Sequence, residues 1–327
     1  MNKKVTSFLL ISVLMGVVIV LSVFLSGSTA PGKEEKQHPL VAALTVSVPI
    51  PDHVKFCDHE ISLERLDMRE RFDREINGFT YLHSTTLLYI KRANRFFPVI
   101  EPILKQYGIP DDFKYLCVIE SNLDTRALSP AKAAGLWQFM EPTAKSYGLE
   151  IRDGVDERYH IEKATEAACR YFRDAYNRYG SWENVAASYN AGTGRISSEM
   201  QRQQVESAFD LLLVQETSRY IFRIMAAKEI FSHPDKYGFI LKKEDLYPPV
   251  PVDLVDVQTD ITDLATFAQQ YGLNYMQLKE YNVWLRDTQL TLPKNRNKIY
   301  QIAIPKKEYL YFKKDHIRVH DPAWVVD

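Results

Sequence analysis

A helical repeat of apolar residues runs through the middle of the chain, from Ile61 to about Glu229, and it limits the possible folds more than any other feature. Apolar side chains recur there at spacings of three and four residues, which places them on one face of successive helices. Breaks at Gly108-Ile109-Pro110 and at Gly180-Ser181 separate one helix from the next. No alternating pattern typical of strands is obvious in this region. We therefore expect a mainly α domain over residues 61–245.

The pattern changes after Pro248-Pro249-Val250-Pro251, which we interpret as a domain boundary. From residue 252 to residue 307 the sequence predicts a short strand, two helices and a second short strand. This order describes a small α+β module, βααβ, followed by a C-terminal tail over 308–327. Ahead of the helical domain, several prolines and a short charged run over residues 31–60 are typical of a linker.

The N-terminal segment is an export signal or an anchor rather than part of the fold. Lys3 and Lys4 precede an apolar run from Val5 to Leu25, and about 20 apolar residues suffice to cross a bilayer. Residues 1–30 are therefore a signal peptide or, if uncleaved, an anchor that makes the membrane a partner. Both alternatives export the rest of the chain to the periplasm or cell envelope. The formal net charge of -1 gives no sign of nucleic-acid binding.

Glu120 lies at the end of a short apolar helix and is the main candidate for acid catalysis. Pro110 suits the first helical position, and Leu116 and Cys117 share one helical face with Glu120. A carboxyl group among apolar side chains loses hydration, which raises its pKa and keeps it protonated near neutral pH. The alternative is a structural glutamate at a helix C-terminus that makes local hydrogen bonds.

A second segment, Gly135-Leu136-Trp137-Gln138-Phe139-Met140, looks like one wall of a sugar-binding cleft. Its apolar residues are more typical of a core, but the amide of Gln138 needs a hydrogen-bond partner if it is buried. That partner is either a sugar N-acetyl group or a backbone carbonyl. The small residues that end at Gly135 would let a bulky substrate approach the backbone closely.

A third segment, Ser188-Tyr189-Asn190-Ala191-Gly192, looks like the opposite wall. Gly192 can end the preceding helix in a left-handed conformation, which puts Tyr189 and Asn190 in its last turn. Side chains in that turn can project into a cleft. The phenol of Tyr189 is placed to hydrogen-bond Glu120 if the two segments meet.

These segments, in this order, resemble the signature motifs of the soluble-type lytic transglycosylases of family 1: Glu120-Ser121, Gly135–Met140 and Tyr189-Asn190-Ala191-Gly192. The resemblance covers roughly residues 60–235, where longer runs are similar to membrane-bound members. It implies a lysozyme-like, mainly helical fold. It also implies non-hydrolytic cleavage between N-acetylmuramic acid and N-acetylglucosamine, which leaves a 1,6-anhydromuramoyl end. Peptidoglycan glycan strands would be the partner, and we expect no cofactor and no metal ion.

The resemblance also implies roles for single residues. Glu120 would be the only acid and base: it protonates the glycosidic oxygen, then deprotonates the C6 hydroxyl that attacks C1 of the same sugar. The substrate's N-acetyl group would act as internal nucleophile, so that no second carboxylate is required. Tyr189 matches the tyrosine that bonds the catalytic glutamate. The remaining positions that match substrate or cleft contacts are Ser121, Ser129, Gly135, Gln138, Met140, Asn190 and Glu216.

Residues 252–307 resemble a degenerate LysM module. The segments Leu264–Gly272, Leu278–Asn282 and Tyr300–Pro305 follow its order, but the usual Gly-Asp-Thr signature is missing. LysM modules bind glycans that contain N-acetylglucosamine, which implies a role in holding the chain on the wall. The alternative is a module that only packs on the catalytic domain.

Two other functional classes stay open. A goose-type lysozyme hydrolyses the same bond with water, and shares the expected fold and the single glutamate. A catalytically silent scaffold would bind the wall without needing Glu120, Gln138 and Tyr189 together. The three cysteines also leave alternatives, since an exported chain can pair two of them.

Overall fold

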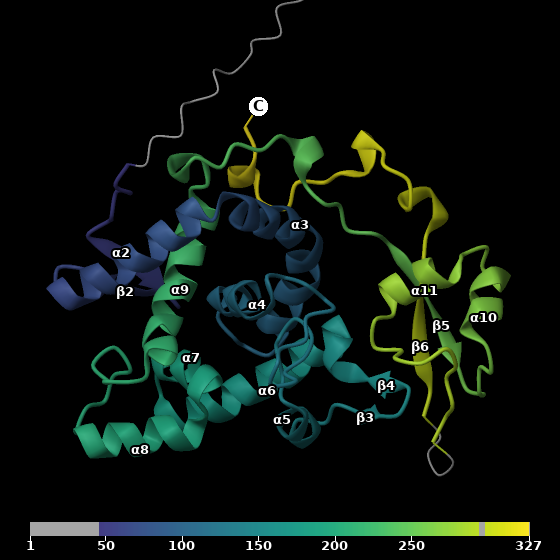
Figure 1. The fold of residues 1–327 in the computed structure, drawn as a ribbon, viewed down its shortest axis with the longest axis horizontal. Helices are drawn as coiled ribbons and strands as arrows, with labels where there is room; N and C mark the ends of the chain where they lie inside the picture. The colour runs from purple at the N-terminus through teal and green to yellow at the C-terminus, as the bar shows by residue number, and fades with distance from the viewer. Residues whose placement is uncertain (1–45, 294–297, 327) are drawn as a thin grey trace, which may run out of the picture. The chain divides into compact units, whose positions relative to one another are not determined.

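The computed structural model describes residues 46–293 and 298–326, which confirm the mainly α expectation (Figure 1). The apolar run from Val5 to Leu25 and most of the expected linker lie outside these residues. The described residues from Ser47 onward form one compact unit. Within the described ranges, no helix combines the length and the apolar character that a membrane span requires.

The helical region is built around a short, buried helix that ends with the candidate acid. This helix, α4, spans Lys114–Ser121, and its residues Tyr115 to Ile119 are all buried. α3 and α9 pack on α4, and α9 also packs along α2 and α7. The helices of the region are α2 (Leu66–Tyr81), α3 (His83–Gln106), α4, α5 (Glu141–Ser146), α6 (Ile161–Tyr179), α7 (Trp182–Ala191), α8 (Thr193–Gln203) and α9 (Gln215–Ser232).

A β-hairpin occupies part of the segment that we expected to be a linker, so the linker prediction is wrong for these residues. Strands β1 (His53–Phe56) and β2 (His59–Ser62) pair antiparallel. Val54 and Phe56 are buried in the same core as the helices. In the turn, the backbone N–H of Cys57 donates to Asp112 Oδ2 at 2.7 Å. The nearby prolines concealed a short alternation of apolar side chains.

A second strand pair lies inside the helical region, where no strand was expected. β3 (Ile151–Arg152) and β4 (Val155–Asp156) pair antiparallel, and each strand is only two residues long. A strand of that length carries no readable alternation. This pair forms contacts with the C-terminal module, since Asp156 N–H donates to Trp284 O at 2.9 Å.

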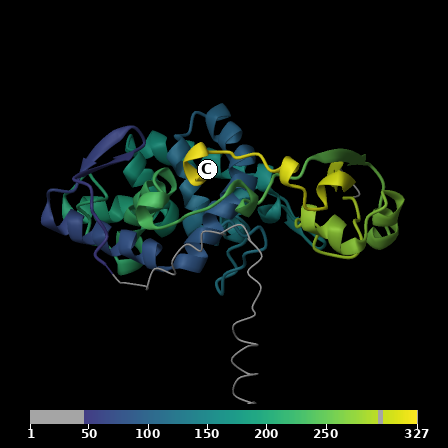
Figure 2. The same cartoon turned by 90° about the horizontal axis from the view of Figure 1, so that it is seen from above.

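The C-terminal module has the expected strand, helix, helix, strand order. Its elements are β5 (Val252–Val257), α10 (Leu264–Gln270), α11 (Tyr275–Tyr281) and β6 (Tyr300–Pro305). β5 and β6 pair antiparallel along their whole length, and both helices lie in the same compact body (Figure 2). The module's apolar cluster includes Ala134, Val155 and Tyr159 of the helical region. The two regions therefore share buried apolar surface.

Charged groups around the buried Glu157 reinforce this contact. The residues of this group are Glu150, Arg152, Glu157, Lys163, Lys298 and Tyr300. Glu157 is 3% exposed and accepts hydrogen bonds from Lys163 at 2.6 Å, from the N–H of Glu150 at 2.7 Å and from Lys298 at 3.2 Å. Lys298 also pairs with Glu150.

The C-terminal residues 308–326 return to the helical region and enter its core, which the description as a tail did not anticipate. Ile317 and Trp324 are buried. The indole N–H of Trp324 donates to Phe231 O at 3.0 Å, and the N–H of His320 donates to Asn94 Oδ1 at 2.8 Å. The helical region therefore depends on residues from beyond the module.

Candidate active site

Glu120 sits at the C-terminal end of α4, half-buried and within reach of a tyrosine on α9. Asn122 takes a left-handed conformation (φ 58°) and ends the helix directly after the acid. The buried Tyr220 donates its hydroxyl to Glu120 Oε1 at 2.5 Å. Burial raises the pKa of Glu120 to about 7, against the lowering effects of Tyr220 and of the Arg223 guanidinium. The expectation of a raised pKa on this residue agrees with the structure.

Tyr189 does not bond Glu120, so that prediction is wrong. Its hydroxyl donates instead to Trp137 O at 2.6 Å. Burial, together with the charge of Glu120, raises the pKa of Tyr189 well above its usual value. Tyr189 therefore lies near the acid without touching it, while Tyr220 makes the contact. The sequence analysis missed Tyr220; the local signal was its position four residues after Glu216 on one helix, where side chains share a face, but this spacing does not reveal the contact with Glu120.

The second segment is shaped by the protein's own backbone. Gly135 has φ +76°, and a Cβ there would lie 1.9 Å from Arg158 O. The close approach we anticipated for a substrate is therefore made by Arg158. Gln138 Nε2 donates to Gly135 O at 2.9 Å and to Ala127 O at 3.2 Å. The hydrogen-bond partners of the Gln138 amide are therefore backbone carbonyls, one of the two alternatives that the sequence left open.

The two serines differ in how far their hydroxyls are available. Ser121 is buried, and its hydroxyl donates to Cys117 O at 2.9 Å within its own helix. Its side chain is directed into the core, which is not where a substrate-binding hydroxyl is expected. Ser129 Oγ accepts the N–H of Ala133 at 3.0 Å, which leaves its hydroxyl hydrogen free to donate. Met140 is 44% exposed, and Asn190 is half-buried.

A pocket of about 340 Å³ lies between α2, the start of α3 and α9. Glu216, which the resemblance predicts to be a cleft residue, is exposed in the first turn of α9 and lines this pocket. Its charge raises the pKa of Glu120, and that of Arg223 lowers it. The lining residues are Glu75, Gly78, Phe79, Leu82, Tyr89, Gln215, Glu216, Arg219 and Arg223.

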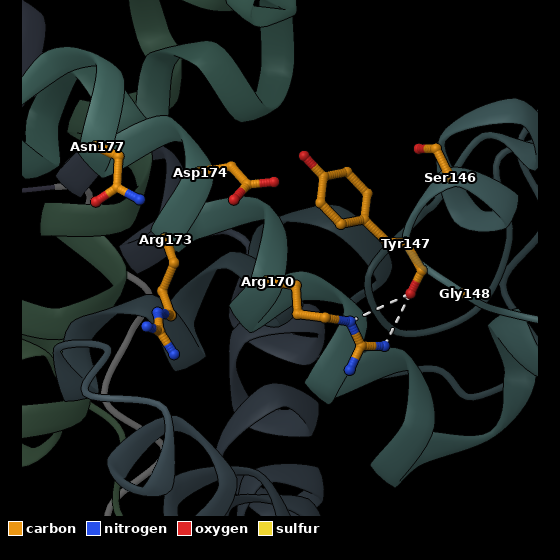
Figure 3. A pocket seen from close by; sticks show the side chains of 7 residues that line it. All are labelled: Ser146, Tyr147, Gly148, Arg170, Arg173, Asp174 and Asn177. Atoms are coloured by element: carbon orange, nitrogen blue, oxygen red, sulfur yellow. Dashed lines mark hydrogen bonds between the residues drawn. The ribbon is translucent and has the colours of Figure 1, made fainter.

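A larger pocket, of about 590 Å³, lies elsewhere and contains none of the expected site residues (Figure 3). Arg170 on α6 donates to Tyr147 O through Nε at 3.2 Å and through Nη2 at 2.8 Å. Asp174 faces the phenol of Tyr147 (Figure 3). We place the candidate site at Glu120, where Tyr220 bonds the acid, and not at this larger pocket.

In the part of the chain that the structure describes, no group of three or more His, Cys, Asp or Glu side chains is arranged to hold a metal ion. Cys57, Cys117 and Cys169 are buried and unpaired. Burial raises the pKa of all three thiols. Their environments are those of buried apolar residues.

Family comparisons match two segments of the chain. Residues 98–211 match the model described as Transglycosylase SLT domain. Residues 253–308 match the model described as Soluble lytic transglycosylase C-terminal LysM-like domain. The chain thus contains an SLT domain followed by a LysM-like domain, as the resemblance of its motifs implied. Glu120, Gln138 and Tyr189 lie inside the first match, whereas Glu216, Tyr220 and Arg223 lie beyond it.

Individual relatives are similar over shorter or longer parts. The chain is 27% identical over 228 residues to Membrane-bound lytic murein transglycosylase D of Escherichia coli (strain K12), covering 68% of this chain and 49% of that protein. It is 26% identical over 133 residues to Membrane-bound lytic murein transglycosylase F of Salmonella typhi, covering 40% of this chain and 26% of that protein. The crystal structure of the 70 kDa soluble lytic transglycosylase from Escherichia coli matches with 18% identity and a TM-score of 0.38, covering 49% and 30%. The chain spans about half the length of the first of these relatives.

Proposed function

We propose that the chain is a peptidoglycan lytic transglycosylase. It cleaves the β-1,4 bond between N-acetylmuramic acid and N-acetylglucosamine without water and leaves a 1,6-anhydromuramoyl end. The observation that carries this proposal is Glu120, a half-buried acid with a pKa raised to about 7, held by Tyr220 and located inside an SLT domain. A carboxyl group with that pKa can both donate and accept a proton near neutral pH.

In the first step the protonated Glu120 donates to the glycosidic oxygen while the C1–O4 bond breaks. The carbonyl oxygen of the substrate's N-acetyl group forms a bond to C1 and gives an oxazolinium ion. Glu120 is then a carboxylate, and its hydrogen bond from Tyr220 becomes stronger because the acceptor is charged. Tyr220 thus stabilises the base that the second step needs.

In the second step Glu120 removes the proton of the C6 hydroxyl, whose oxygen attacks C1 of the same sugar. The bond from C1 to the N-acetyl oxygen breaks, and the 1,6-anhydro ring closes. Glu120 is protonated again, so that no other acid or base is consumed. A second carboxylate as nucleophile is unnecessary, in contrast to retaining glycosidases with two carboxylates.

The remaining candidate residues would shape the cleft rather than take part in the chemistry. Met140 and Asn190 offer an apolar and an amide contact, and the free hydroxyl hydrogen of Ser129 can bond a sugar oxygen. Tyr189 and Gln138 act through the backbone that they hold, since their polar groups bond Trp137 O and Gly135 O. Gly135 and Ser121 contribute conformation and packing.

The two ends of the chain complete the proposal. The Val5–Leu25 segment would deliver the chain to the periplasmic side of the inner membrane, either as a cleaved signal or as an anchor. The LysM-like domain would bind glycan strands and increase the local concentration of substrate. A position in the cell envelope would follow from both.

Mass spectrometry of purified peptidoglycan digested with the chain tests the reaction. The expected muropeptides are one water lighter than those of a lysozyme, because the C6 hydroxyl is the acceptor. Reducing N-acetylmuramic acid ends as the dominant product would instead identify a hydrolase of the goose-type class. The absence of any cleavage would identify a wall-binding scaffold.

A further inference from the structure

Arg223 lies near the candidate acid, whose pKa its charge lowers, and it forms no ion pair with a carboxylate of the described residues. Its guanidinium is half-buried, and Nη2 donates to Ile119 O at 3.3 Å. A guanidinium carries five N–H donors, so most of its hydrogen-bonding capacity is unused by that single contact. None of the described carboxylates forms an ion pair with it, although such pairs are common for half-buried arginines.

The neighbouring arginine in the same pocket, Arg219, is paired with a carboxylate. Arg219 forms two parallel hydrogen bonds to Glu75, through Nε at 2.7 Å and Nη2 at 3.0 Å. Glu75 is 3% exposed and also accepts from Arg74 at 2.9 Å. The charge of Arg219 is thereby compensated inside the protein. Arg223, one turn further along α9, forms no such ion pair in the described residues.

Arg223 lies on the same helical face of α9 as the residue that bonds the candidate acid. Glu216, Arg219, Tyr220 and Arg223 follow the spacing of one helical face on α9. Tyr220 bonds Glu120, and the other three line the pocket of about 340 Å³. α2 and α9, which form two of its walls, lie side by side (Figure 1). None of the lining residues lies within residues 98–211, which match the SLT model.

A guanidinium with unused N–H donors in a pocket favours planar anions, and carboxylates bind it through two hydrogen bonds. The strands assigned under the proposed function carry carboxylates in two places. The stem peptide has its own carboxylates, and removal of that peptide frees the lactyl carboxylate of the muramic acid. Both sources lie on the sugar whose bond would be cleaved next to Glu120.

We propose that the pocket between α2, α3 and α9 is a subsite for a carboxylate carried by the muramic acid, and that Arg223 binds it. This inference rests on the proposed function for the identity of the strand. Arg223 is then a specificity residue: it favours substrates that present a carboxylate over otherwise identical strands that present none.

The test measures binding of short glycan strands to the full chain in a Glu120→Gln background, which removes turnover. One probe carries stem peptides with free carboxylates. A second has lost its peptides and exposes lactyl carboxylates. A third carries stem peptides whose carboxylates have all been converted to amides. Binding by the LysM-like domain contributes to all three probes alike, so the differences between probes report the pocket.

We expect at least one carboxylate-bearing probe to bind about tenfold more tightly than the amidated probe, a difference of about 1.4 kcal/mol. Adding Arg223→Gln should remove this difference while the amidated probe keeps its affinity. Arg223→Lys keeps the charge without the planar fork and should retain part of the preference. Arg178→Gln, an exposed arginine of α6, is the matched control and should leave all three affinities unchanged.

The probe that loses affinity identifies the source of the carboxylate, peptide or lactyl. Equal affinity of the parent chain for all three probes would overturn the inference. So would an Arg223→Gln variant that weakens the amidated probe as much as the others. If the Gln variant does not fold, the Lys variant decides the same comparison. Product analysis with Glu120 restored is a separate measurement, so failure to form anhydro ends would reject the proposed reaction, while the binding comparison would still report whether the pocket binds a carboxylate.

Discussion

Glu120 and Glu157 are both shielded from water, yet their pKa values move in opposite directions. Burial raises the pKa of Glu120 to about 7, and its single close donor is the neutral hydroxyl of Tyr220. Burial also acts to raise the pKa of Glu157, but hydrogen bonds from Lys163 and from the N–H of Glu150 outweigh it and lower the value. Glu157 is the more buried of the two by exposed surface.

The difference teaches that partners, and not burial alone, decide what a shielded carboxyl group does. Surrounded by cations, Glu157 is a permanent anion that fixes the helical region to the module. With one neutral donor, Glu120 changes protonation near neutral pH. The same residue type therefore serves structure in one region and chemistry in the other.

The largest expected effect concerns activity. Glu120→Gln should reduce glycan cleavage by about 10²–10⁴-fold or more, because an amide neither donates nor accepts the proton in transfer. The matched variant Glu157→Gln should keep cleavage within about tenfold, provided that it is assayed where it is folded. Release of anhydro muropeptides measures both. Wild-type cleavage rates in the Glu120→Gln variant would contradict the assignment of Glu120 as the catalytic acid and base.

The same Glu120→Gln variant should be more stable than the parent at alkaline pH. The folded pKa of about 7 lies above the ordinary glutamate value of 4.5, so the folded protein loses stability as pH rises from about 4.5 to about 7. Glutamine has no charge to bury, and the gain at pH 8 should be about 3 kcal/mol. Urea unfolding at pH 4, 6 and 8 measures it. At pH 4 the difference should vanish, and a gain that does not depend on pH would contradict this account.

Glu157→Gln should show the opposite sign. Its folded pKa is lowered, so its contribution is present above the unfolded value and is lost as pH falls through the folded value. We expect the variant to lose about 2 kcal/mol at pH 7, because Lys163 and Lys298 lose their charged acceptor. The loss should shrink below about pH 4. Glu166→Gln, whose pair with Arg170 is exposed, is the control and should cost under about 1 kcal/mol.

The sequence predicts the helical region and the βααβ module well because both rest on local spacing. Glu120 was found in the same way, since its apolar neighbours Leu116 and Cys117 share its helical face. The hydrogen-bond partner of Glu120 was not predicted. Tyr220 is 100 residues away from Glu120 in sequence, and the two side chains meet only because α9 packs on α4. Spacing along one helix does not reveal which other helix lies opposite.

The same limit applies to the ends of the chain. The short strands β1 and β2 were concealed among prolines, and nothing local marks Trp324 as a core residue of the helical region. Deleting everything from Val252 onward would remove Trp324 and expose Val155 and Tyr159, which pack against the module. Such a truncation would therefore unfold the helical region as well as remove the LysM-like domain, and point variants are the better test of glycan binding.

The smallest expected effect distinguishes the two tyrosines that the sequence could not. Tyr220→Phe removes the only hydroxyl that touches Glu120 in the described residues, so the chemical step should slow about tenfold. The hydroxyl of Tyr220 lowers the pKa of Glu120, so its loss should also move the pH at which Glu120 deprotonates upward. Tyr189→Phe removes a hydrogen bond to Trp137 O instead and should cost about 1 kcal/mol of stability, with a smaller loss of rate and no shift of the pH profile. The pH dependence of kcat for both variants measures the difference. If Tyr189→Phe shifts the profile and Tyr220→Phe does not, the assignment of the tyrosine that controls Glu120 must be reversed.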